Sequence, residues 1–343
     1  MVSQLGLRPG GCHKPCLKFF LLGGAGVDLF FVLSGFLITR IIIQRSQSDL
    51  QFLKTFYYRR ALRILPPYFL LVVLFWIIVS GGVNNAVFNA ETPLWMHLTF
   101  IQNFWMAEHG TYGPDGIGVT WSVAIEEQYY LVFPLLALLL PRRCLPWALF
   151  LIALGSIFFR GFIFTMDPQN DFPANLHTLA RLDGLAVGGL IACAFGNDRW
   201  LALLRKHNAM IKRTMVTMAV LAFLLVKRTS GVQMAYFGHT FLTILFGLVI
   251  INVLLNLGSS VRGMRILRSQ KLRFLGKISY SVYLFHPLIL AASFLFAGLP
   301  KTLSGVPQIA LLAGALALTL FLCNLMFDKI EQPLIALGRT QRY

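Results

Sequence analysis

Apolar stretches long enough to cross a bilayer recur along nearly the whole chain, and they restrict its fold more than any other feature. Hydrophobic residues make up 57% of the 343 positions, whereas soluble domains are about 45–50% apolar. The segment from Leu94 to Trp105 is too short to cross and is typical of an interfacial or re-entrant piece. The sequence therefore predicts an all-α, polytopic membrane helix bundle with about nine transmembrane helices. The predicted spans are 27–43, 64–83, 123–140, 146–164, 182–197, 213–227, 236–257, 277–298 and 307–327.

Basic residues are concentrated in alternate short loops between these spans. The net charge is +17, but its distribution indicates cytoplasmic loops beside anionic lipid and not a nucleic-acid partner. Under the positive-inside rule the C-terminus and these loops share the cytoplasmic side. The basic loops are 44–63, 142–143, 199–213 and 262–273.

The N-terminus is the one place where the charge rule is violated. Residues 1–18 lack the apolar core and cleavage site of a signal peptide. The predicted orientation would leave Arg8, Lys14 and Lys18 on the outer face. One further span before Val27 would restore the rule and give ten helices. We therefore treat 1–18 as an atypical N-terminus, 19–343 as the membrane domain, and the absence of a natural first helix as a hypothesis.

The five cysteines predict neither disulfides nor a metal centre, because their number is odd and no pair spacing repeats. Cys12 and Cys16 flank His13, but a zinc site needs about four ligands and the neighbouring sequence supplies no others. Cys193 and Cys323 lie within apolar spans and are interpreted as packing residues.

Asp28 stands near the start of the first predicted span, in the stretch GVDLFFVLSGFLITR. A lone carboxylate there is costly. It is explained either by the first turn of a helix, which favours negative charge, or by an internal cavity in which the carboxylate takes part in chemistry. Position alone leaves both interpretations open.

Two adjacent carboxylates, Glu126 and Glu127, open another span in WSVAIEEQYYLVFP. Side chains on successive helical residues point about 100° apart, so at most one of the two readily faces a given cavity. The pair is consistent with an interfacial helix start, where the dipole favours acids and Trp and Tyr form a belt. The second interpretation is a carboxylate that orients a base or binds a sugar hydroxyl.

Three arginines, Arg59, Arg60 and Arg63, lie at the cytoplasmic edge in FYYRRALRILPPYFLL. Arg59 and Arg63 are four residues apart and share a helix face. Such a cluster can determine topology and anchor lipid. Alternatively, the planar guanidinium groups can hold the phosphates of a cytoplasmic cofactor.

His286 lies about nine residues into a span after Lys277, roughly 13–14 Å deep, in LGKISYSVYLFHP. We expect it to face the interior, with a hydrogen bond across helices as the first interpretation and catalysis as the second. Arg181 with Asp183, and the late stretch DKIEQPL, are interpreted as interfacial caps. Small residues favour close packing of the helix that contains them, and here these are Gly184, Gly188 and Gly189.

Together, six of these stretches resemble the acyltransferase-3 family of integral membrane O-acyltransferases, which move acyl groups onto envelope sugars and some secondary metabolites. The resemblance covers nearly the whole chain from Gly24 onward. The stretches, in the family's order, are GVDLFFVLSGFLIT, RRALR followed by ILPPY, WSVAIEEQYYL, RLDGLAVG, SYSVYLFHP and EQP.

The resemblance implies about ten helices in a bacterial inner membrane and no metal. The donor would be cytoplasmic acyl-CoA, typically acetyl-CoA, and the acceptor a hydroxyl of a carbohydrate or glycoside on the far side. Lipid is the other expected partner, and oligomeric state stays open. By position, Asp28 and Glu126 are implied to be catalytic, and Arg59, Arg60 and Arg63 to bind the donor. Residues implied to contact substrate are Trp121, Ser122, Glu127, Tyr130, Tyr280 and His286.

The family's general base is a histidine on the first membrane helix, eleven positions after an arginine. Here Arg8 precedes His13 by five, and LRPGGCHKPC cannot form the middle of a membrane helix. His13 is therefore a candidate base in the wrong surroundings, and we expect either an active O-acyltransferase or one impaired by loss of its first helix. Two alternatives are a transporter whose path is lined by Asp28, Glu126 and His286, and a non-catalytic membrane scaffold.

Overall fold

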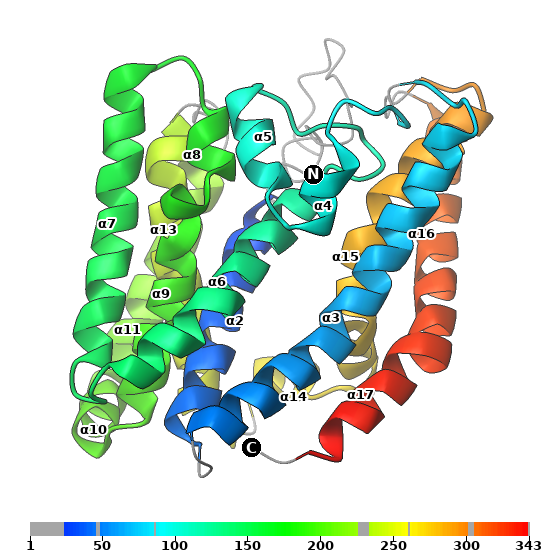
Figure 1. Cartoon of the computed structure of the whole chain (residues 1–343). Coiled ribbons are helices and arrows are strands. Elements are labelled where there is room, and N and C mark those ends of the chain that lie inside the picture. The colour runs from blue at the N-terminus through cyan, green and yellow to red at the C-terminus, as the bar shows by residue number, and fades with distance from the viewer. Residues whose placement is uncertain are drawn as a thin grey trace.

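The computed structural model describes residues 24–45, 49–85, 87–225, 233–259, 261–300 and 305–341. Within these ranges all regular structure is helical, and nine helical segments are long and apolar enough to cross a membrane (Figure 1). The predicted polytopic all-α bundle is confirmed. His13, Cys12 and Cys16 lie outside the described residues.

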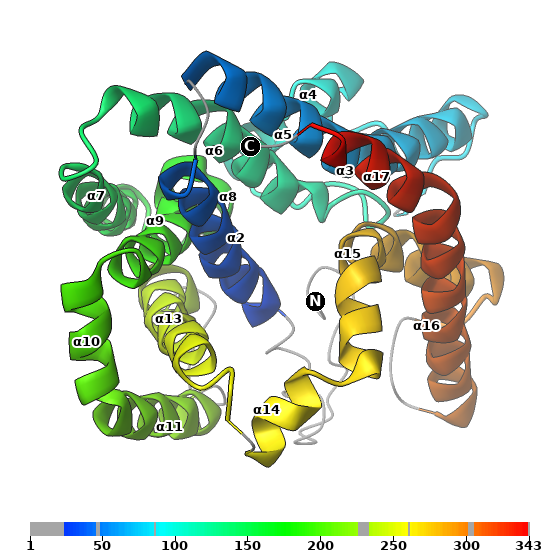
Figure 2. The ribbon, with the colours of Figure 1, turned by 90° about the horizontal axis from the view of Figure 1, so that it is seen from below.

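One side of the bundle is built around α9, which packs against α2 and α7 (Figure 2). Helix α13 contacts α2, α9 and α11, so α2 is enclosed by protein along one face. This arrangement places the first turns of α2, α9 and α13 together. The helices of this side are α2 (Ala25–Ile43), α7 (Leu145–Met166), α9 (Thr178–Phe195), α10 (Asp198–Lys206), α11 (Asn208–Leu225) and α13 (His239–Leu255).

The other side is formed by α3, α15 and α16, with the C-terminal α17 packed against α3. Helix α6 (Thr120–Leu139) lies between the two sides and contacts α2, α3 and α9. Its residues therefore face both groups of helices. The elements of the second side are α3 (Asp49–Ser80), α15 (Gln270–Phe296), α16 (Val306–Met326), the π-helical turn η2 (Phe327–Glu331) and α17 (Gln332–Arg339).

The two ends of the bundle differ in charge. We call the end with α10, α14 (Arg262–Leu267) and α17 the basic end, because the predicted basic loops lie there (Figure 1). We call the opposite end, with α4 (Leu94–Leu98), α5 (Gln102–Glu108) and α8 (Phe172–Leu176), the far end. The segment from Leu94 to Trp105 thus forms parts of two helices, each too short to cross a bilayer, as its length predicted.

The arginine run lies inside a helix and not in the loop that precedes one. We predicted a span over 64–83, but α3 begins at Asp49 and continues through Pro66 and Pro67. The helix is longer than the predicted span, because apolarity alone defined that span. Phe52 and Phe56 are fully buried, and burying two such rings stabilises this part of the helix.

Helices α2 and α9 approach closely because glycines face each other's backbones. A Cβ atom at Gly188 would overlap the carbonyl oxygen of Val32, and one at Gly35 would overlap that of Leu185. The predicted role of the small residues in close packing is confirmed at Gly188.

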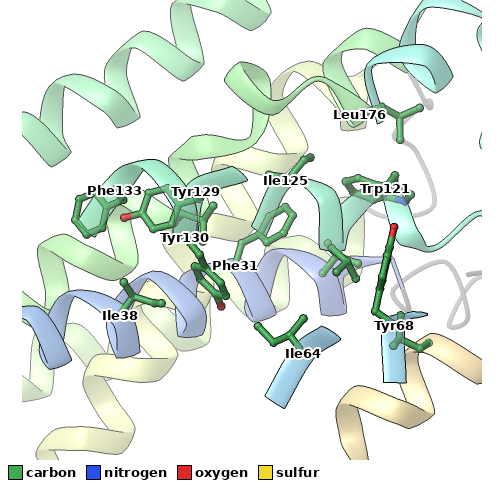
Figure 3. Close-up of a cluster of buried hydrophobic side chains, with 14 of the residues drawn as sticks. Phe31, Ile38, Ile64, Tyr68, Trp121, Ile125, Tyr129, Tyr130, Phe133 and Leu176 are labelled. Carbon is green, nitrogen blue, oxygen red and sulfur yellow. The ribbon is translucent and has the colours of Figure 1, made fainter. Parts of the chain in front are cut away.

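An aromatic cluster holds α6 against α2 (Figure 3). The rings of Phe31 and Trp121 meet edge to face, with centroids 6.3 Å apart. Tyr129 and Phe133 stack at 4.6 Å about two turns further along α6. Such pairs favour defined ring orientations, so the cluster fixes the face of α6 that carries Glu126.

Candidate active site

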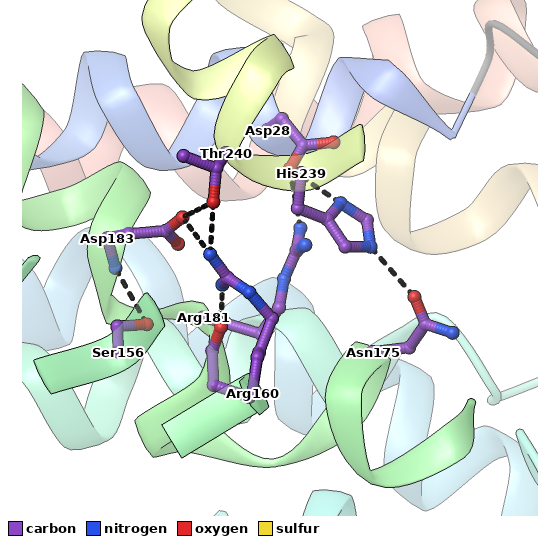
Figure 4. A network of polar contacts seen from close by, with 9 residues as sticks. Asp28, Ser156, Arg160, Asn175, Arg181, Asp183, His239 and Thr240 are labelled. Atoms are coloured by element: carbon purple, nitrogen blue, oxygen red, sulfur yellow. Dashed lines mark hydrogen bonds and ion pairs between the residues drawn. The ribbon is translucent and has the colours of Figure 1, made fainter. Parts of the chain in front are cut away.

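Asp28 is buried near the far end of the bundle and holds two partners through one oxygen. Nη2 of Arg181 lies 2.7 Å from Oδ1, and Nδ1 of His239 lies 3.0 Å from the same atom (Figure 4). The second oxygen, Oδ2, is buried and has no hydrogen-bond partner among the described residues. Only 2% of Asp28 is exposed, so of its two interpretations the structure favours the internal one.

The two partners of Asp28 come from α9 and α13, and a residue of α8 contacts one of them. Arg181 lies in the first turn of α9, and its guanidinium carbon is 5.6 Å and 6.0 Å from the ring centroids of Phe31 and Trp121. His239 is the first residue of α13, directly after the π-helical turn η1 (Met234–Gly238). Nε2 of His239 lies 2.8 Å from Oδ1 of Asn175 in α8. The sequence analysis missed His239 and Asn175.

A second buried ion pair lies beside the first. Nη2 of Arg160 in α7 is 2.7 Å from Oδ2 of Asp183 and 2.5 Å from the hydroxyl of Thr240. Arg160 also donates to the carbonyl of Ala180, and the Ser156 hydroxyl accepts the Asp183 N–H. The interpretation of Arg181 and Asp183 as interfacial caps was wrong, because each pairs inside the protein, where an unpaired charge would be costly.

Glu126 is the centre of a polar group deeper along α2 and α6. The hydroxyl of Ser34 donates to Oε1 of Glu126 at 2.6 Å, and the Tyr130 hydroxyl also donates to that oxygen. The guanidinium of Arg60 lies 4.9 Å from the Tyr130 ring centroid. Glu127 is only half-buried, and the structure gives its buried Oε1 no partner among the described residues. The two carboxylates therefore face different surroundings, as their angular separation predicted.

The three arginines of α3 have different surroundings. Nε of Arg59 donates to the carbonyl of Gly338 at 3.2 Å and so ties α3 to α17. Arg60 faces Tyr130. Arg63 is exposed and interacts electrostatically with Glu126, among other groups. Of the three, Arg60 and Arg63 are thus the ones near the Glu126 carboxylate.

Helix α15 presents its polar residues to three neighbouring elements. The Ser122 and Tyr283 hydroxyls lie 2.6 Å apart, and the Tyr280 hydroxyl donates to the carbonyl of Ile64 at 3.1 Å. Ser281 donates to Glu331. Glu331 is 3% exposed, so its interpretation as part of an interfacial cap was wrong: the π-helical turn η2 carries it inward.

His286 faces the protein interior as predicted, but its hydrogen bonding differs from the expectation. Nδ1 lies 2.8 Å from the carbonyl oxygen of Tyr283 and 3.0 Å from that of Val282, both in its own helix. We predicted a bond across helices, and among the described residues the structure shows none. Pro287 follows and has no N–H to donate to the Tyr283 carbonyl four residues earlier, so that carbonyl is available to the ring.

Two polar side chains at the far end, one in α4 and one in the loop before α6, lie close to the first turn of α6. Burial lowers the pKa of His97 to about 4, and its Nδ1 lies 3.4 Å from the Thr120 hydroxyl. Burial also raises the pKa of Tyr112 to about 12, and its ring centroid is 6.4 Å from that of Trp121. Both side chains are therefore neutral near pH 7 and add no charge to the site.

The site offers carboxylates, hydroxyls and cations away from water. The free oxygen of Asp28 can accept the hydrogen of a substrate hydroxyl, and cations beside it stabilise negative charge that develops during reaction. Within the described ranges, no group of three or more His, Cys, Asp or Glu side chains could hold a metal ion. The chemistry that these groups support is proton transfer and positioning of a polar substrate.

The fold and these interior charges define a multi-pass membrane protein with a polar site inside its helix bundle. The chain belongs to the acyltransferase-3 family, because the family's acyltransferase domain matches residues 11–327. It therefore carries an acyltransferase domain.

The chain is similar to several bacterial proteins. It is 26% identical to a peptidoglycan O-acetyltransferase, OatA, of Listeria monocytogenes over 328 residues, 91% of this chain and 51% of the relative. It is also 26% identical to a putative peptidoglycan O-acetyltransferase, YrhL, of Bacillus subtilis over 347 residues, 94% and 51% of the two chains. An uncharacterised Haemophilus influenzae protein is 31% identical over 179 residues, 48% of this chain and 73% of that one. The chain spans about half the length of the first two relatives, and no solved structure matches it.

Proposed function

We propose that this acyltransferase moves an acetyl group from acetyl-CoA, bound from the basic end, to a hydroxyl of an envelope carbohydrate at the far end. The names of the relatives support acetyl as the group and, for two of them, peptidoglycan as the acceptor. We place the protein in a bacterial inner membrane with its C-terminus in the cytoplasm, on the distribution of Lys and Arg.

The observation that carries the proposal is the unpaired oxygen of Asp28. A buried carboxylate oxygen without a donor is costly, and a hydroxyl is the donor that this reaction brings. The acceptor oxygen attacks the thioester carbonyl, the carbon–sulfur bond breaks, and the hydroxyl proton passes through a base to the departing thiolate. Asp28 binds the acceptor hydroxyl, and His13 is the proposed base.

Glu126 is proposed to act between donor and acceptor, because it is linked to Ser34 of α2 and lies near Arg60 of α3. Arg60 and Arg63 are proposed to hold the donor phosphates, while Arg59 fixes α17 over that end. Side chains proposed to line the path of the substrates are Trp121, Ser122, Glu127, Tyr130, Tyr280 and His286.

The test is transfer of labelled acetyl groups from acetyl-CoA to envelope carbohydrate in membranes that contain the full chain. Asp28→Asn should lower the transfer rate by at least about 100-fold, whereas the control Asp49→Asn alters an acid that is 61% exposed and should transfer normally. Elution of both variants as single species in detergent would show that they fold. No transfer by the wild-type chain would overturn the function, and full activity of Asp28→Asn would overturn the role of Asp28.

The orientation has its own test. A protease-sensitive tag after Tyr343 should be cleaved only when the membrane is opened. Cleavage of the tag on intact cells would overturn the proposed cytoplasmic C-terminus.

A further inference from the structure

Both ring nitrogens of His239 face an oxygen atom. Nδ1 lies 3.0 Å from Oδ1 of Asp28, and Nε2 lies 2.8 Å from Oδ1 of Asn175 (Figure 4). The Asn175 amide is oriented independently, because its Nδ2 donates to the carbonyl of Asp171 at 2.9 Å. If the amide were turned over, its Oδ1 would face the carbonyl oxygen of Asp171, and two acceptors would oppose each other. Nε2 of His239 must therefore be a donor.

A neutral histidine carries a single N–H. With that hydrogen on Nε2, a neutral ring would point the lone pair of Nδ1 at a carboxylate oxygen. One further proton must lie between Asp28 and His239. Arg181 donates to the same carboxylate oxygen at 2.7 Å and stabilises the anion, so the proton belongs on Nδ1.

We propose that His239 is an imidazolium fixed between Asp28 and Asn175, and that it is the positioning residue that keeps Oδ2 of Asp28 available to the acceptor hydroxyl. The second part rests on the proposed function. The chain itself provides for this placement, because the π-helical turn η1 ends directly before His239. Such turns are rare, shift side-chain register and often lie at functional sites.

The charges around His239 leave the cluster with one positive charge in excess. Arg181 pairs with Asp28, and Arg160 pairs with Asp183, so the imidazolium is the unbalanced charge. An acyl transfer that builds negative charge on oxygen is favoured beside it. At high pH, loss of the Nδ1 proton of His239 would leave a nitrogen lone pair facing Oδ1 of Asp28. The repulsion would turn the Asp28 carboxylate away. The charged groups that act on His239 are Asp28 on α2, Arg160 on α7 and Arg181 on α9, and Asp183 on α9 pairs with Arg160 and contacts the neighbouring Thr240.

The protonation state can be read without any enzymatic assay. Nitrogen-15 NMR of the histidine-labelled chain in lipid nanodiscs should show a ring with both nitrogens protonated at pH 6. The signal of this ring should disappear in His239→Gln and persist in His207→Gln, which alters an exposed histidine and serves as the control. If His239→Gln does not fold, the signal that changes its chemical shift in Asn175→Asp is assigned to His239. A neutral ring with bare Nδ1 at pH 6 would overturn the inference.

The positioning role is tested by the pH profile of acetyl transfer. Asn175→Asp offers Nε2 a charged acceptor and should move the alkaline limb upward by about one pH unit, whereas Asn175→Leu removes the acceptor and should move it downward. If His239 had a merely structural role, the Asn175 variants would lower the rate of acetyl transfer and leave the alkaline limb of its pH profile in place. That outcome would refute the positioning role. If His239 is an imidazolium but no acetyl transfer is detected, the proposed function alone is overturned. If acetyl transfer occurs while the His239 ring is neutral, this inference alone is overturned.

Discussion

Replacement of Gly188 by alanine tests whether the contact of α2 with α9 builds the site. A Cβ atom at Gly188 would lie 2.6 Å from the amide nitrogen of Phe36 and would overlap the Val32 carbonyl oxygen. Both obstacles are backbone atoms, so no side chain can turn away to make room. Ordinary contact begins at about 3.4 Å, and the helices must therefore separate by close to 1 Å or more.

The change in the unfolding free energy of Gly188→Ala is the sum of two opposing contributions. Alanine is favoured over glycine in a helix by about 1 kcal/mol, whereas overpacking costs about 1–3 kcal/mol. Gly155 in α7 provides the matched control, because a Cβ atom there meets nothing within 4 Å. Gly155→Ala gains the same propensity without the clash, so the difference in unfolding free energy between the two variants measures the clash alone.

The effect should reach the reaction as well. Asp28 and Arg181 lie further along the same two helices, and their 2.7 Å contact would exceed hydrogen-bonding distance if the helices separated by 1 Å. We expect acetyl transfer to fall by about 100-fold in Gly188→Ala and to stay unchanged in Gly155→Ala. Unfolding is measured by SDS titration in mixed micelles. Equal stability of the two variants would refute the packing argument.

Three further substitutions test separate contacts. Arg60→Lys keeps the charge but loses the planar group over the Tyr130 ring, so the KM for acetyl-CoA should rise by about tenfold in transfer assays; an unchanged KM would remove Arg60 from the donor site. Asp183→Asn leaves Arg160 buried without its counter-ion and should cost about 3–5 kcal/mol of unfolding free energy in the SDS titration, against a loss below 1 kcal/mol if the pair were solvated. The third substitution is His97→Gln. Burial lowers the pKa of His97 from 6.5 to about 4, so between these pH values the unfolded chain binds a proton that the folded chain does not, and the unfolding free energy of the wild type should fall by up to about 3 kcal/mol as pH drops from 6.5 to 4. An unfolding free energy of His97→Gln with the same pH dependence as wild type would contradict this.

Features that depend on local composition could be predicted from the sequence. The apolar spans follow from residue type alone, because a bilayer demands continuous apolar length. The motif around Asp28 and the glycines near Gly188 were also informative, since small residues in a membrane helix let its backbone approach a neighbouring helix closely. The start of α3 was not predictable from apolarity, because it depends on which neighbours bury Phe52 and Phe56.

The partners of Asp28 could not be predicted, because they depend on pairing between distant helices. His239 is 211 residues from Asp28 and follows a π-helical turn that no residue pattern indicates. In the sequence, Arg181 resembles an ordinary charge at a helix end. Only the packing of α2 against α9 shows that it pairs with Asp28. Arg160 did carry a signal: an arginine within an apolar span needs an internal partner, and a search for that partner among nearby acids would have found Asp183.

The distance along the chain between Asp28 and Arg181 has a consequence for how the protein is made. The two residues are 153 positions apart, which at about 5–20 residues per second is about 8–30 s of synthesis. Arg160 and Asp183 are only 23 positions apart and can meet as soon as α9 emerges. Until then α2 carries an unpaired acid, worth about 2.5–3.5 kcal/mol against insertion if it reaches the bilayer centre. Ribosome-bound chains that end before α9 should therefore hold α2 in the membrane less firmly than chains that end after it.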